Sequence, residues 1–123
     1  MRLPVLLRCL LILALAALAA APALAHALLV RAAPSVGATV TTAPGDVTIT
    51  FSESIEPAFS SIVVQNAAGD RVDVGQPHPV QGDAHRFAVG LKPLPPGTYA
   101  VSWKATSTDT HKTQGRFSFT VKP

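Results

Sequence analysis

Residues 94–105, Leu-Pro-Pro-Gly-Thr-Tyr-Ala-Val-Ser-Trp-Lys-Ala, form the stretch that decides the fold. From Tyr99 onward, apolar and small or polar residues alternate with a period of two, so Tyr99, Val101 and Trp103 share one face. That alternation is typical of a β-strand with one face in a core and the other in water. The Pro-Pro-Gly sequence before it predicts a tight corner leading into the strand.

Similar short segments lie on both sides of this strand. They are separated by turn signals about every ten residues, and no helical pattern occurs beyond residue 25. About seven strands of this kind predict an all-β, antiparallel Greek-key sandwich or barrel, in which a tyrosine corner at Tyr99 would fit. We expect strands at 27–31, 47–51, 61–65, 71–74, 86–91, 99–105 and 116–121, a hairpin loop at 66–70, and longer loops at 75–82 and 106–114.

The first 25 residues read as a secretory signal peptide. A positively charged start at Met1-Arg2 precedes an uninterrupted apolar run at 9–21, and Ala23-Leu24-Ala25 supplies the small-x-small cleavage pattern. Removal of residues 1–25 leaves 26–123, which is 123 − 25 = 98 residues. That length is enough for one small domain with one core.

Cysteine and charge exclude several classes of function. Cys9 is the one cysteine and lies inside the signal, so the processed chain can form neither a disulfide nor a thiolate metal site. The net charge of +3 includes Arg2 and Arg8, so processing leaves 8 − 7 = +1. The basic residues are scattered singly along the sequence. Neither nucleic acid nor an anionic membrane is therefore expected as a partner, and no membrane insertion is expected after cleavage.

Two pieces of the sequence read as halves of one metal site. Cleavage after Ala25 would leave His26 as the first residue, whose amine and ring Nδ1 can chelate one ion together. Asp109 and His111 are two residues apart, and in an extended segment such residues point to the same side about 6.5 Å apart. Three nitrogen donors and one oxygen favour copper(II), which prefers a square arrangement of such donors. We expect one copper(II) ion per mature chain.

The sequence as a whole resembles the CopC family of periplasmic copper-resistance proteins. The resemblance runs along the mature chain and rests on His26-Ala27, Phe51-Ser-Glu53, residues 94–103, Ser107-Thr-Asp-Thr-His111 and Gly115-Arg-Phe-Ser-Phe-Thr-Val121. It implies a cupredoxin-like (Ig-like) Greek-key fold, a periplasmic location, and copper(II) ligation by His26, Asp109 and His111. It also implies a partner like the inner-membrane copper transporter CopD.

The resemblance gives Glu53 two alternative roles. Its carboxylate could hydrogen-bond a metal ligand or the terminal amine and fix the geometry of that donor. Otherwise Glu53 is an exposed loop acid.

Two departures from the family pattern have consequences. The family usually has Gly between the Asp and the His, where this chain has Thr110, and a backbone needing positive φ would be strained by Thr. Some members also carry a copper(I) site in a Met-rich loop, whereas Met1 is the one methionine of this chain. Without thioether ligands, no copper(I) site is expected.

Other functions remain as alternatives. A metal-free Ig-like accessory module would share the predicted fold. A histidine-brace copper oxygenase would share the terminal His, but Asp109 would fill the position that a catalytic metal keeps open, so an enzyme is not expected. His78 and His85 are expected to be solvated loop or strand-edge residues, and Trp103 to belong to the core.

Overall fold

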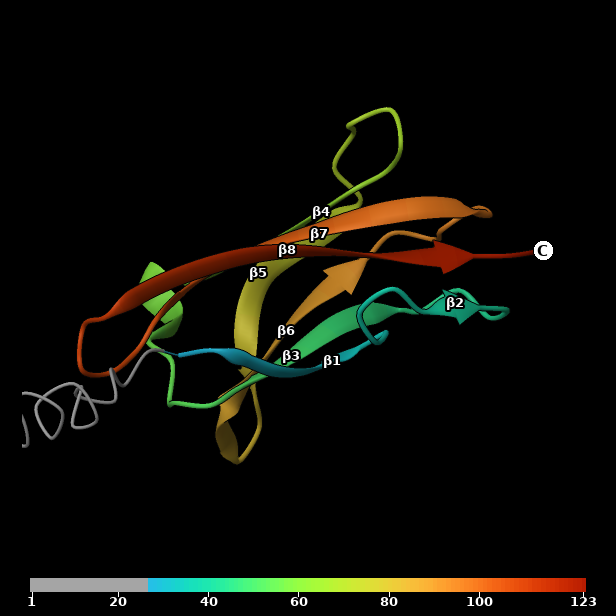
Figure 1. The fold of residues 1–123 in the computed structure, drawn as a ribbon. Helices are drawn as coiled ribbons and strands as arrows, with labels where there is room; N and C mark the ends of the chain where they lie inside the picture. Colours follow the sequence, from blue (N-terminus) through green and yellow to red (C-terminus); the bar gives the residue numbers. More distant parts are fainter. Residues whose placement is uncertain (1–26) are drawn as a thin grey trace, which may run out of the picture.

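The computed structural model describes residues 27–123 and consists of strands joined by turns, with one short 3-10 helix (Figure 1). The elements are β1 (Leu29–Ala33), β2 (Thr39–Val40), β3 (Asp46–Phe51), η1 (Pro57–Phe59), β4 (Ser61–Gln65), β5 (Asp73–Val80), β6 (Asp83–Leu91), β7 (Gly97–Thr106) and β8 (Lys112–Val121). The predicted signal, residues 1–25, lies outside the described residues, and so does His26.

The strands form two four-stranded sheets, one ordered β1-β3-β6-β5 and the other β2-β8-β7-β4. All neighbouring strands are antiparallel except β2, which joins β8 in parallel. The hairpin of β7 and β8 is the longest pairing, from Gly97 opposite Val121 to Thr106 opposite Lys112. The predicted all-β sandwich is confirmed; β2 was not anticipated.

The core lies between the sheets, where alternate residues of each strand are buried as the period-two pattern predicts. The ring of Phe51 on β3 meets the indole of Trp103 on β7 edge-on, with centroids 5.2 Å apart. Tyr99 and Phe119 stack at 5.5 Å across the β7–β8 pair. Trp103 is thus a core residue, as expected.

Two positions, Tyr99 on β7 and Gly115 on β8, fix the geometry of this hairpin. The Tyr99 hydroxyl donates to the carbonyl of Pro95, which is the hydrogen bond of the expected tyrosine corner. On β8, Gly115 lies opposite Trp103, and a Cβ added there would lie only 2.5 Å from Cζ2 of the indole. Glycine is required at 115 because the indole occupies the space of a side chain.

Two expectations for the middle of the chain are wrong in part. The segment after the 66–70 turn returns along β4 only as far as Val72, through the Gln65–Arg71 bridge and a hydrogen bond from the Val72 N–H to the Val64 carbonyl at 2.8 Å. It crosses to the other sheet, where β5 pairs with β6. Residues 75–80, expected to be a loop, continue β5 with an interrupted register. The prolines of this segment are tolerated because β5 is an edge strand.

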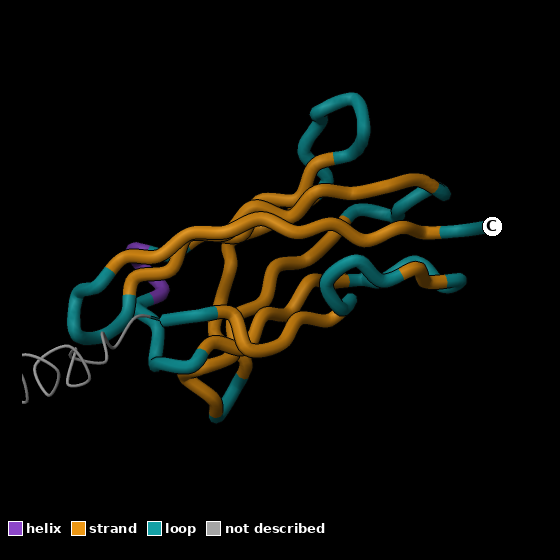
Figure 2. The backbone as a smooth tube through the Cα atoms, in the orientation of Figure 1, coloured by secondary structure: helices purple, strands orange, loops and turns teal. Residues whose placement is uncertain are grey.

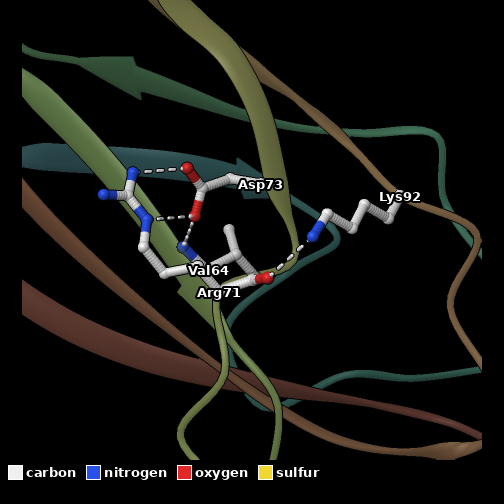
Figure 3. Close-up of polar contacts among 4 residues, drawn as sticks. All are labelled: Val64, Arg71, Asp73 and Lys92. Carbon is white, nitrogen blue, oxygen red and sulfur yellow. Dashed lines mark hydrogen bonds and ion pairs between the residues drawn. The ribbon is translucent and has the colours of Figure 1, made fainter.

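The crossing is held by the carboxylate of Asp73, whose side chain is 3% exposed (Figure 3). Its Oδ1 accepts a hydrogen bond from the Val64 backbone N–H at 2.9 Å. Its Oδ2 forms a salt bridge with the Arg71 guanidinium at 2.6 Å. Burial raises the pKa of Asp73, but the hydrogen bonds from Arg71 and Val64 outweigh it and lower the pKa below its usual value. The side chain thus covers the free edge of β4 and ties the two sheets together.

Candidate metal centre

The Asp-x-His sequence forms the turn between β7 and β8 and does not lie in an extended segment. The Ser107 N–H donates to the carbonyl of His111 at 2.9 Å, and the Thr110 N–H donates to the carbonyl of Ser107 at 2.9 Å. Thr110 has φ = 72°, the one positive φ at a non-glycine position among residues 27–123. The concern about Thr at this position is therefore confirmed, since the backbone needs the conformation that favours glycine.

This turn brings the side chains of Asp109 and His111 together. Oδ2 of Asp109 lies 3.1 Å from Nδ1 of His111, and both side chains are 48% exposed. The prediction that the two side chains converge is confirmed, although a tight turn brings them together rather than the alternation of a strand. An open carboxylate–imidazole pair of this kind can offer one oxygen and one nitrogen to a metal ion.

Ser107 is a residue of the site that sequence reasoning assigned no role. It is 1% exposed, and its hydroxyl donates to Oδ1 of Asp109 and lies 3.2 Å from the His111 carbonyl. The hydrogen bond from Ser107, and then that from His111, lower the pKa of Asp109. Ser107 therefore holds the carboxylate charged and in one orientation, with Oδ2 toward the imidazole. A small hydroxyl residue two positions before the Asp was the available signal.

The first described residues lie at the same end of the molecule as this turn (Figures 1 and 2). Ala27 is fully buried, and its carbonyl accepts a hydrogen bond from Thr113 Oγ1 at 2.5 Å. The Leu28 N–H donates a hydrogen bond to the Ser52 hydroxyl, and the Ser52 N–H donates one to the Leu28 carbonyl, both at 2.9 Å. The start of the described chain is therefore held against Thr113, which is two residues after His111.

Glu53 lies between two segments that border the site. Its neighbour Ser52 is bonded to Leu28, and its other neighbour, Ser54, accepts a hydrogen bond from the Thr108 N–H at 3.1 Å. Glu53 is partly buried, and within residues 27–123 no group donates to its carboxylate. Glu53 therefore lies between the segment that is hydrogen-bonded to Leu28 and the segment that is hydrogen-bonded to Thr108.

The part of the chain that the structure describes holds no cluster of three or more His, Cys, Asp or Glu side chains arranged for a metal. Asp109 and His111 thus offer two candidate donors, and the predicted third and fourth donors belong to His26, outside the described residues. His78 and His85 are exposed on β5 and β6 and take no part in this site. Among the described helices, none is long and apolar enough to cross a membrane.

Comparison with known proteins gives the family. The model of the CopC domain matches residues 29–122. The chain belongs to the CopC family. It is 36% identical to Protein YobA of Escherichia coli K12 over 99 residues, covering 80% of each chain.

Two solved structures share the fold of this CopC domain. The CopC crystal structure from Methylosinus trichosporium OB3b superposes with a TM-score of 0.74 at 32% identity, covering 80% of this chain and 95% of that one. PcoC of Escherichia coli, described as a methionine-rich copper resistance protein, superposes with a TM-score of 0.71 at 32% identity, covering 80% and 100%.

Proposed function

We propose that the mature chain, residues 26–123, is a periplasmic copper(II)-binding protein that sequesters or delivers one ion. The donors are the amine and ring Nδ1 of His26, the carboxylate of Asp109 and the ring of His111. The observation that carries the proposal is the 3.1 Å separation of Asp109 Oδ2 and His111 Nδ1. Two donors bound at right angles to one ion, each at about 2.0–2.2 Å, lie about 3 Å apart. The pair is therefore spaced as adjacent corners of a copper(II) square.

The anchoring of Ala27 supports the assignment of the other two donors. The Cα of residue 26 is about 3.8 Å from that of Ala27 because a trans peptide joins them. The Ala27 carbonyl is bonded to Thr113, two residues after His111. A terminal His26 created by signal cleavage would therefore begin within side-chain reach of the Asp109–His111 pair. Glu53 is placed to accept a hydrogen bond from the His26 amine or ring and orient it.

Family membership supports copper as the ion, since the related PcoC is described as a copper resistance protein. The sulfur ligands that copper(I) prefers, Cys and Met, are absent from residues 26–123, so the proposal concerns copper(II). Four protein donors would fill the square around the ion, which suits holding and transfer rather than catalysis. The recipient or source would be a membrane protein like CopD.

The test is a copper(II) titration of two forms of the protein, one beginning at a free His26 and one in which the His26 amine is acetylated. Acetylation removes the amine–ring chelate but leaves Asp109 and His111 unchanged. We expect the acetylated form to bind at least 100-fold more weakly and the paramagnetic resonance spectrum to lose nitrogen donors. Equal affinity of the two forms would refute the terminal chelate. No binding by either form would favour a metal-free accessory module.

Metal binding should also raise the free energy of unfolding. At a free copper(II) concentration 100 times the Kd, linkage predicts about 2.7 kcal/mol of added stability for the form beginning at His26. Affinity should fall on acidification because the donors bind only when deprotonated.

A further inference from the structure

One sheet of the sandwich carries charge of a single sign. Strands β2, β4, β7 and β8 contain no Asp or Glu, whereas β7 and β8 contribute Lys104, Lys112 and Arg116. The acidic residues lie on the other sheet or in connections: Asp46, Glu53, Glu56, Asp70, Asp73, Asp83 and Asp109. The expectation that the basic residues are scattered is therefore wrong in three dimensions, although it holds along the sequence.

The three cations are close neighbours on the outer face. Lys104 pairs with Gln114, so Lys112 and Arg116, two residues either side of Gln114, are its diagonal neighbours. Diagonal neighbours on one face of a sheet lie about 7–8 Å apart, within reach of long side chains. All three are exposed, and no carboxylate on this sheet offsets their mutual repulsion. An approaching group of negative charge would relieve it.

The same face is hollowed. Two adjoining depressions of about 620 and about 430 Å³ share Lys104 and Gln114, so together they form one groove along β7 and β8. The groove runs from Phe59 at one end to Arg116 at the other, and no Asp or Glu lines it. Small residues, among them Ser61, Ser102 and Gly115, line the part of the groove toward Arg116.

Phe59 adds an apolar contact at the end nearest the Asp109–His111 turn. The Phe59 carbonyl accepts a hydrogen bond from Thr106 Oγ1 at 2.9 Å, and the Ser60 hydroxyl accepts one from the Thr106 N–H at 3.0 Å. This residue is nevertheless 72% exposed. An aromatic ring on a firmly held backbone loses little conformational freedom on binding, which is typical of residues that anchor protein interfaces.

We propose that this groove is a docking site for an extended, acidic segment of a partner protein. Carboxylates of the segment would pair with Lys104, Lys112 and Arg116, and an apolar side chain would pack on Phe59. The concave shape favours a protruding chain segment over a bilayer, because a flat surface does not enter a groove. The groove adjoins the turn that carries Asp109 and His111, so the partner would dock beside that site. The proposal stands on charge and shape and does not require metal binding.

The test is a titration of the ¹⁵N-labelled chain beginning at His26, without metal, by a synthetic decapeptide of alternating Glu and Ala. We expect amide shifts confined to β4, β7, β8 and η1, weakening as salt is added. The variant K104Q/R116Q should bind about five- to tenfold more weakly. The matched control, R31Q/R86Q, removes two exposed charges from the other sheet and should change binding less than twofold. Phe59→Ala should weaken the binding of a peptide in which one Ala is replaced by Leu, and should leave the binding of the Glu-Ala peptide unchanged.

Three results would overturn the proposal. One is equal loss of binding in K104Q/R116Q and R31Q/R86Q, which would mean attraction by net charge alone. Another is shifts of the same size with a Gln-Ala peptide. The third is binding to phosphatidylglycerol vesicles, but not to the acidic peptide, through the same residues. That result would make the face a membrane contact. Thermal melts of each variant show whether a loss of binding comes from unfolding.

Discussion

Replacing Ser107 by alanine separates the stability of the β7–β8 turn from its capacity to hold a metal ion. The buried hydroxyl has two contacts, the Asp109 carboxylate and the His111 carbonyl. The carbonyl keeps its hydrogen bond from the Ser107 N–H, and the half-exposed carboxylate can bind water instead. The loss of stability should therefore be about 1 kcal/mol, the usual value of one hydrogen bond. In a domain of this size that lowers Tm by about 4–8 °C.

The effect on metal affinity should be larger than the effect on folding. With Oδ1 held by Ser107, Oδ2 of Asp109 faces the His111 ring. Without the hydroxyl the carboxylate can rotate, and the metal must then restrict it on binding. Loss of a group that orients a ligand typically costs 10- to 100-fold in affinity. We expect Ser107→Ala to weaken copper(II) binding by that factor in the chain that begins at His26.

Competitive titration of copper(II), followed by Trp103 fluorescence, measures the loss of affinity. Thermal unfolding without metal measures the loss of stability. The control is Thr110→Ala, which removes a hydroxyl that donates to the Asp109 carbonyl rather than to its carboxylate. It keeps a Cβ at the same φ, so the backbone requirement is unchanged. Unaltered affinity in Ser107→Ala, or an equal loss in Thr110→Ala, would show that Ser107 does not orient the ligand.

Two further predictions concern the sandwich. Gly115→Ala should destabilise by about 2 kcal/mol or more, since its methyl group would lie 2.5 Å from Cζ2 of Trp103; urea unfolding should show a much smaller change for Gly45→Ala, which has nothing within 4 Å. Asp73→Asn should cost about 1.5–3 kcal/mol at pH 7, because the charged acceptor of the Val64 N–H is lost. Folding lowers the pKa of Asp73, so this difference should persist above about pH 4 and disappear as pH falls through the folded pKa.

Each of these two predictions has an outcome that contradicts it. Equal unfolding midpoints for Gly115→Ala and Gly45→Ala would mean that the indole moves aside at no cost. For Asp73, a stability difference from Asn that is independent of pH would show that the carboxylate acts by shape rather than by charge.

The sequence predicted the features that arise from local pattern. The alternation at Tyr99, Val101 and Trp103 assigned the buried face of β7, because side chains of a strand alternate whatever the strand pairs with. The spacing of Asp109 and His111 identified the pair that the turn brings together. The family resemblance, based on motifs along the chain, agreed with the domain match over residues 29–122.

The sequence could not predict features that depend on which segments meet in space. Residues 71–80 have the composition of a hairpin return and a loop, yet from Asp73 onward they pair with β6, and the Asp73 carboxylate takes the place of a strand partner at the Val64 N–H. The bond from Thr113 to Ala27 joins residues 86 positions apart. The charge of Lys104 becomes part of a cluster only because β7 and β8 pair in one register. Periodicity is a property of neighbours in sequence, whereas register, crossing and charge clustering arise from contacts between distant segments, which only the folded chain defines.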